Sequence, residues 1–451
     1  MKLTFHGGAK TVTGANYLLE NDSTKILVDC GLHQGSSFCE KHNFEPFPYD
    51  PKTIDAVFVT HAHIDHIGRL PQLVKSGFRG KIFSTPPTKD FAEYLLIDSE
   101  HLLTKEAESK GLASIYGLQD IPPTMAKWER IPYHQKIKIK NFSAELFDAG
   151  HILGSSFISI ISEGKRIVFS GDLGNIATPI VRDTEPLPKT DYALIESTYG
   201  ARLHEDLDTR QEVLEDLIED TVKAGGVLMI PAFAMERTQA LLFELNELAE
   251  NGRIPRVPIF IDSPLAIKLT SVYQKYSGDP RYFDEEATAL LKKGDAIFDF
   301  PGLKFTLTPE QSKETNRVPP PKVVIAGAGM SQGGRILHHE SRYLSDPKSS
   351  ILFIGYQAQG SLGRQILDGA KTVRIFDQEI PVRCRTKSIG GYSAHADQAR
   401  LLQWLTPPRS SIKKIFVVQG EEEQSAALSQ KIKDELAIDA HIPSQGESVV
   451  L

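Results

Sequence analysis

This sequence has few cysteines, no excess of positive charge and no long apolar runs. Its three cysteines among 451 residues, Cys30, Cys39 and Cys384, are too few and too scattered for a disulfide framework or a cysteine zinc knuckle. No apolar run approaches the length that spans a membrane, and the first residues, MKLTFHGG, lack the apolar stretch of a secretory signal. We therefore expect a cytoplasmic protein that makes no membrane contact.

The sequence also has no surplus of basic side chains. It carries 51 lysines and arginines against 58 aspartates and glutamates, a formal net charge of −7. This balance excludes a protein that coats nucleic acid through a broad basic surface. It does not exclude an enzyme that acts on phosphate groups, because bound metal ions and a few arginines supply the positive field locally.

The chain is too long for one hydrophobic core, so the sequence predicts more than one domain. Up to about residue 200, strand-like segments follow one another with few helices between them, which predicts a sandwich of sheets. Beyond that point helical and strand-like segments alternate, a pattern typical of a parallel sheet with helices on both faces. We expect an α/β protein in which residues 205–384 form a domain inserted between residues 1–204 and 385–451.

A dense set of metal-binding side chains, His61-Ala-His63-Ile-Asp65-His66, follows the predicted strand at 55–60. Residues two apart on an extended chain project to the same side, so His61 and His63 can bind one ion. The chain then turns, and Asp65 and His66 can face a second ion. Imidazole and carboxylate ligands without thiolate favour zinc, with manganese or iron as alternatives.

Two more candidate ligands come from distant parts of the chain. His151 lies in a glycine-bounded turn between predicted strands, and Asp172 follows the apolar strand at 167–169. Either residue alone is typical of a hydrogen-bonded turn. Beside the HAHIDH segment both become candidate ligands, since a carboxylate such as Asp172 can bridge two ions about 3.5–4 Å apart that share a hydroxide. The sequence therefore predicts a binuclear centre that generates a nucleophile at neutral pH.

These segments resemble a known family. In chain order, Asp29, the HAHIDH segment, His151 and Asp172 resemble the successive motifs of the metallo-β-lactamase fold. LIESTYG, with Glu196 at a strand end, and GYSAHAD, with His395, resemble the first and second motifs of the β-CASP family. Four segments between them resemble the inserted domain of that family: IPAFA, IDSPLA, GMSQGG and GYQAQGSL. The whole chain is similar to bacterial and archaeal relatives of the endonuclease that cleaves pre-mRNA 3′ ends.

The resemblance implies an αββα sandwich with an inserted β-CASP domain, and it implies roles for individual residues. The resemblance implies that the first ion is bound by His61, His63 and His151. The second ion is bound by Asp65 and His66, and Asp172 is shared by both ions. The implied catalytic residues are His395 as general acid, Glu196 to orient it, and Asp65. Asp29 is implied as a hydrogen-bond acceptor that orients the metal site.

One position departs from the family pattern. RNA-cleaving members carry a histidine after a C-terminal strand, as a ligand of the second ion, whereas this chain has Gln419 in the segment FVVQGE. An amide oxygen can ligate a metal weakly but lacks the basicity of imidazole. We therefore expect a looser second metal site and slower cleavage rather than loss of activity.

A glycine-rich loop, GAGMSQGGR, follows a predicted strand and opens a helix at residues 327–335. Its backbone amides can form a phosphate-binding nest, although a simple tight turn between strand and helix accounts for it equally well. The resemblance favours contact with the RNA backbone. The candidate phosphate-binding residues are Gly329, Ser331, Gln332 and Gly333.

The sequence and the resemblance together predict a ribonuclease. We expect a two-metal hydroxide mechanism on single-stranded RNA, endonucleolytic, 5′–3′ exonucleolytic or both, with zinc as the ion and manganese as the alternative. Two other functions stay open because of Gln419: a DNA nuclease of the same fold, and a non-catalytic RNA-binding partner with a weakened second metal site. The resemblance also implies a homodimer.

Overall fold

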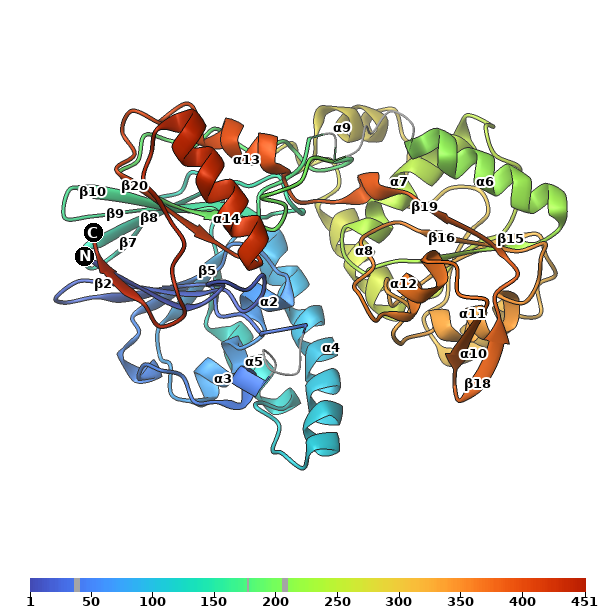
Figure 1. Cartoon of the computed structure of the whole chain (residues 1–451), viewed down its shortest axis with the longest axis horizontal. Helices are drawn as coiled ribbons and strands as arrows, with labels where there is room; N and C mark the ends of the chain where they lie inside the picture. The colour runs from blue at the N-terminus through green and yellow to red at the C-terminus, as the bar shows by residue number, and fades with distance from the viewer. Residues whose placement is uncertain (36–40, 177, 205–209) are drawn as a thin grey trace. The chain divides into compact units, whose positions relative to one another are not determined.

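The structure, a computed structural model, describes residues 1–35, 41–176, 178–204 and 210–451. The chain divides into two compact units (Figure 1). Unit 1 contains Met1–Ile176, Val181–Leu203 and His395–Leu451, and unit 2 contains His204–Ala394 with a short segment before Val181. The boundary expected at residue 384 falls just before β19 (Arg385–Ser388), a strand that pairs with β16 (Ser350–Phe353) of unit 2.

Unit 1 is built on two mixed sheets of seven strands each. The first sheet has the order β22-β1-β2-β3-β4-β5-β6, with bounds Ser448–Val450, Lys2–Gly7, Asn16–Glu20, Lys25–Val28, Ala56–Phe58, Lys81–Ser84 and Trp128–Arg130. The second has the order β21-β20-β11-β10-β9-β8-β7, with bounds Ala440–His441, Lys414–Val418, Tyr192–Glu196, Lys165–Phe169, Ser156–Ser162, Phe142–Asp148 and Ile137–Ile139.

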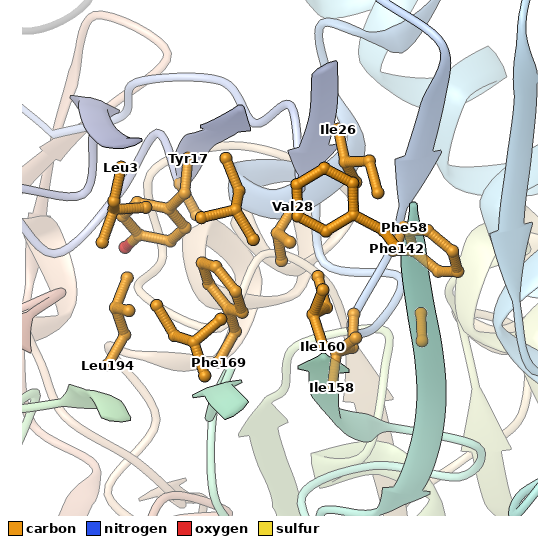
Figure 2. Close-up of a cluster of buried hydrophobic side chains, with 14 of the residues drawn as sticks. Leu3, Tyr17, Ile26, Val28, Phe58, Phe142, Ile158, Ile160, Phe169 and Leu194 are labelled. Carbon is orange, nitrogen blue, oxygen red and sulfur yellow. The ribbon is translucent and has the colours of Figure 1, made fainter. Parts of the chain in front are cut away.

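The two sheets of unit 1 bury a shared apolar core between them (Figure 2). Alternate residues of β8 are buried, as expected for a strand with one face on a core. Side chains from both sheets meet in this layer, among them Leu3, Tyr17, Ile26, Val28 and Phe58 from the first sheet and Phe142, Ile158, Ile160, Phe169 and Leu194 from the second. This core fixes the sheets face to face, so the loops at their edges are held in defined positions.

Helices cover the outer face of each sheet and complete an αββα sandwich (Figure 1). The first sheet is covered by α3 (Leu70–Lys75), α4 (Pro86–Lys110) and α5 (Ile121–Ala126), and the second by α13 (Gln398–Leu405) and α14 (Glu422–Lys431). The architecture predicted for this part of the chain is confirmed. Within the described residues, the helices lack the combination of length and apolar character that crossing a membrane requires.

Unit 2 contains a six-stranded sheet in which all neighbouring strands are parallel. Its order is β14-β13-β15-β12-β16-β19, and the strands not yet given are β12 (Val227–Pro231), β13 (Ile259–Ile261), β14 (Leu303–Phe305) and β15 (Lys322–Ala326). Every residue of β12, β13, β15 and β16 is buried, as expected when helices cover both faces. The helices include α6 (Arg210–Ala224), α7 (Arg237–Glu250), α8 (Pro264–Tyr276), α9 (Glu285–Lys292), α10 (Pro309–Thr315), α11 (Ile336–Tyr343) and α12 (Leu362–Leu367). The parallel sheet predicted for the insert is confirmed.

Candidate metal centre

The HAHIDH segment lies at the carboxyl end of β4 in the first sheet. Because β3 and β4 are parallel neighbours, Asp29 and His61 follow their strands at the same edge. Residues Ile64–Ile67 form the short helix α2, with His63 as the residue before it. A Cβ atom on Gly31 would lie 1.5 Å from the backbone oxygen of Asp65, so only glycine allows the two loops to approach this closely.

The second sheet brings its polar residues to an edge in the same way. Strands β10, β11 and β20 are parallel neighbours, and they are followed by Asp172, by Glu196 as the last residue of β11, and by Gln419. His151 lies in the loop between β8 and β9. The turn before Asp172 contains Gly171 at φ +55°, where a Cβ atom would lie 2.7 Å from the Cβ atom of Thr60. The fold thus brings side chains from both sheets to one place in unit 1.

Three imidazoles and one carboxylate converge there. The His63 Nδ1 atom is 3.0 Å from His61 Nε2 and 3.2 Å from His151 Nε2. The Asp172 Oδ2 atom is 3.4 Å from His61 Nε2 and 3.6 Å from His151 Nε2. One ligand atom from each of these four residues lies within 4.8 Å of the other three. Three nitrogens and one oxygen at such spacing can surround a single divalent cation.

The charge states of this cluster suit a metal ion. Burial lowers the pKa of His63 and of His151 well below the ordinary value of 6.5, so both rings are neutral at neutral pH. Burial raises the pKa of Asp172, but His66, His61 and His395 together lower it well below its ordinary value. Ring nitrogens that carry lone pairs therefore face an ionised carboxylate, which is the donor set that zinc and related cations require.

The other oxygen of Asp172 faces a second group of side chains. Asp172 Oδ1 is 3.4 Å from His66 Nε2, which is itself 3.8 Å from Asp65 Oδ2. Burial lowers the pKa of His66, but the carboxylates of Asp172, Asp29 and Asp65 raise it well above 6.5. This side of Asp172 therefore favours positive charge. A carboxylate with each oxygen directed at a different ligand group has the arrangement of a bridging ligand.

Gln419 contacts this second group through its amide nitrogen. The Nε2 atom donates a hydrogen bond to Asp172 Oδ1 at 2.7 Å and lies 3.1 Å from His66 Nε2. The amide oxygen accepts from the hydroxyl of Tyr17 at 3.4 Å. The residue is buried and has a φ of +51°, which side chains other than glycine adopt at some cost in energy. The sequence pointed to the amide oxygen as a weak ligand, whereas here the nitrogen faces the carboxylate.

Asp29 and Thr60 fix the orientation of two of the histidines. Asp29 accepts hydrogen bonds from the Thr60 amide and hydroxyl, both at 2.8 Å, and from His66 Nδ1 at 2.7 Å. The Thr60 hydroxyl also accepts from His61 Nδ1 at 3.1 Å. These bonds hold both rings through Nδ1 and direct the Nε2 atom of each ring at Asp172. Thr60 was not predicted from the sequence; its place at a strand end directly before His61 was the available signal.

His395 and Glu196 form a pair beside the metal-binding cluster. The His395 Nδ1 atom is 3.2 Å from Glu196 Oε2 and 3.9 Å from Asp172 Oδ2. Glu196 is fully buried and accepts a hydrogen bond from the Leu173 amide at 2.7 Å. Burial lowers the pKa of His395, but the charges of Glu196 and Asp172 raise it to about 10. A protonated imidazole whose Nδ1 is held by a carboxylate can donate a proton from its other nitrogen.

The glycine-rich loop belongs to unit 2 and follows β15. Ser331 is buried, and its hydroxyl donates to the Glu340 carboxylate. Gly329 packs so closely on Phe233 that a Cβ atom would lie 2.7 Å from the ring. Gln332 is exposed, and a Cβ atom on Gly333 would meet open space. The four predicted phosphate-binding residues thus lie in one loop, with Ser331 and Gly329 also engaged in packing inside the unit.

Three domain families match successive parts of the chain. Residues 18–181 match the Metallo-beta-lactamase superfamily domain, residues 238–366 match the Beta-Casp domain, and residues 379–443 match the Zn-dependent metallo-hydrolase RNA specificity domain. A crystal structure of a protein of unknown function from Enterococcus faecalis V583 has a similar fold. It matches with a TM-score of 0.55 and 13% sequence identity, over 100% of this chain and 99% of that one.

Curated relatives match along nearly the whole chain. Ribonuclease TTHA0252 of Thermus thermophilus is 39% identical over 432 residues, which is 95% of each chain. The RNase J-like protein of Methanocaldococcus jannaschii is 31% identical over 98% of each chain. Cleavage and polyadenylation specificity factor subunit 3-I of Arabidopsis thaliana is 32% identical over 91% of this chain and 57% of that protein. The sequence motifs, the fold and these matches agree: the chain belongs to the β-CASP family of the metallo-β-lactamase fold.

Proposed function

We propose that this protein is a metal-dependent ribonuclease that hydrolyses phosphodiester bonds of single-stranded RNA. The observation that carries the proposal is the convergence of three imidazoles on one carboxylate with the His395–Glu196 pair directly beside them. Relatives that are named as a ribonuclease and as an RNase J-like protein support the substrate. The match to the Zn-dependent metallo-hydrolase RNA specificity domain supports a divalent metal and RNA together.

We assign the ligands in two groups that share Asp172. His61, His63 and His151 would hold the first ion, while Asp65 and His66 would hold the second. Zinc suits these nitrogen and oxygen donors, with manganese as the alternative. When bound, a pair of such ions supplies a nucleophile from water at neutral pH and offsets the charge of the phosphate.

The protein's own residues supply the proton and the orientation of the groups. His395 would donate the proton on Nε2 to the departing 3′ oxygen, which leaves a 3′-hydroxyl and a 5′-phosphate. Glu196 holds the other ring nitrogen and stabilises the imidazolium before transfer. Asp29 and Thr60 keep the ring nitrogens of His61 and His66 directed at Asp172.

Location and assembly complete the proposal. We assign the protein to the cytoplasm because of its few cysteines and its lack of long apolar runs. We also expect it to form a homodimer, on the basis of family resemblance. Cutting can be internal, from the 5′ end, or both, and end-labelled RNA with and without a 5′-phosphate distinguishes these modes.

The substrate class is tested by comparing RNA with single-stranded DNA of the same sequence. We expect the purified, metal-loaded protein to cleave the RNA faster, because only RNA offers 2′-hydroxyls to the binding surface. Product length and end groups are read by mass spectrometry. Faster turnover of DNA would replace the proposal with a DNA nuclease. Metal binding without turnover of either substrate would instead favour a non-catalytic RNA-binding partner.

His395→Ala tests the assignment of the general acid. Loss of the proton donor should reduce the cleavage rate by about a hundredfold or more. Metal content, measured by mass spectrometry on the same sample, should stay as in the parent protein. His101→Ala, which removes an exposed histidine of α4, is the matched control and should change neither quantity. A variant of His395 that retains full activity would refute the assignment.

Gln419→His tests the second metal site. An imidazole at this position adds a basic ligand, so the second ion should bind tighter by about tenfold or more, since even hydrogen-bond partners of ligands change affinity by that amount. Activity at limiting zinc should rise in parallel. Calorimetric titration of the metal-free protein measures both binding steps, and Gln419→Ala serves as the control. An unchanged second binding step would show that this position does not contact the ion.

A further inference from the structure

A pocket in unit 2 lies between α10 and α11, two helices that lie next to each other in Figure 1. Its volume is about 450 Å³. The side chains that carry its chemistry are basic or neutral polar: Ser312, Lys313, Arg335, His338, His339 and Arg342. None of the described residues that line this α10–α11 pocket is an aspartate or a glutamate. Such a lining attracts anions.

Beneath the α10–α11 pocket lies a carboxylate whose hydrogen bonds all go to neighbouring side chains. Asp262, the residue after β13, is fully buried. It accepts from Thr306 at 2.7 Å and Ser312 at 2.6 Å, and it pairs with His339 Nε2 at 2.7 Å and Arg335 Nη1 at 2.8 Å. Although burial raises the pKa of Asp262, these hydrogen bonds lower it well below its ordinary value. The ionised carboxylate of Asp262 thus holds three of the side chains that line the pocket, Ser312, Arg335 and His339, in place.

Arg335 is held in one orientation by this network. Besides Asp262, its Nη1 atom donates to the backbone oxygen of Thr306 at 2.9 Å, and its Nη2 atom donates to that of Leu307 at 3.0 Å. About a fifth of the side chain, 20%, stays exposed to the pocket side and solvent. A guanidinium that is fixed before a ligand arrives loses little conformational entropy on binding.

The rim of the α10–α11 pocket carries two basic side chains that form no ion pair with the described residues of the protein. Lys313 on α10 and Arg342 on α11 are exposed, and neither forms an ion pair with any residue that the structure describes. The nearby Lys322 is buried, and burial together with the charge of Arg342 lowers its pKa to about 8. The smaller of these two effects is repulsion between Lys322 and Arg342, two cations that lie close together on this side of unit 2.

We propose that the α10–α11 pocket binds phosphate groups of the RNA strand. The inference rests on the proposed ribonuclease function for the identity of the polyanion. The cations are spread along the pocket rather than gathered at one point, since Arg335 and Arg342 are seven residues apart, about 10 Å along a helix. Lys313 faces them from the other helix. A strand with successive phosphates fits this distribution better than one free phosphate does.

The test removes the two rim cations while the buried network stays intact. In the full chain, the double variant Lys313→Glu/Arg342→Glu should bind a fluorescent single-stranded RNA about tenfold more weakly or worse, as measured by anisotropy. The dependence of log Kd on log salt should flatten by about 0.7 for each phosphate that the variant no longer binds. Hydrolysis of bis-p-nitrophenyl phosphate, a small phosphodiester that reaches only the metal centre, should be unchanged, as should the metal content.

The matched control is Arg256→Glu/Lys293→Glu, which makes the same change of charge at exposed positions of unit 2 outside the pocket. If both double variants show the same affinity and salt dependence, the pocket assignment is wrong although the ribonuclease proposal stands. If the parent protein hydrolyses the small phosphodiester but neither binds nor cleaves RNA, the ribonuclease proposal fails and the RNA assignment fails with it. If inorganic phosphate binds the parent protein more tightly than RNA does, and Lys313→Glu/Arg342→Glu abolishes that binding, the ligand is a free phosphate and the RNA assignment is overturned.

Discussion

The buried carboxylate of Asp172 is the group on which the rest of the site depends. An ionised carboxylate out of water is costly unless cations or hydrogen-bond donors surround it. Here Oδ2 faces His61 and His151, while Oδ1 faces His66 and the amide of Gln419. Because burial keeps the His151 imidazole neutral, this ring offers a lone pair rather than a proton, and a cation between the side chains would complete the first of these groups. The site is thus arranged for metal before any substrate binds.

The fold meets this requirement by joining the carboxyl edges of two sheets. Parallel strands deliver Asp29 and His61 on one side, and Asp172 and Gln419 on the other. The apolar core between the sheets holds these edges together. Asp29 and Gln419 have φ angles of +60° and +51°, which cost backbone strain energy. The fold accepts this strain because these conformations place the two side chains at the site. The strands and the core between them therefore stabilise the fold, and the residues at and after the strand ends carry the side chains of the site.

The long elements of the fold were predictable from the sequence, because their hydrophobic patterns are regular. Strands such as β12 and β15 and helices such as α4 and α6 occur as expected from their periodicity. Short pieces that depend on tertiary pairing, such as β14 and β19, carry no such pattern and were missed.

The candidate ligands follow from sequence motifs, whereas the orientation of their side chains does not. The hydrogen bond from Thr60 to Asp29 and the direction of the Gln419 amide depend on residues that only the folded chain brings together. The α10–α11 pocket could not be predicted from the sequence for the same reason. Its cations come from two helices separated by a strand, and neither helix is markedly basic by itself.

The most direct test of the account is anomalous scattering at the zinc edge from crystals of the zinc-loaded protein. We predict a peak about 2.0–2.2 Å from His61 Nε2, His63 Nδ1, His151 Nε2 and Asp172 Oδ2, the bond lengths of zinc to nitrogen and carboxylate oxygen. A weaker peak is predicted near His66, on the far side of Asp172. Fully zinc-loaded crystals with no peak among the first four atoms would contradict the central claim.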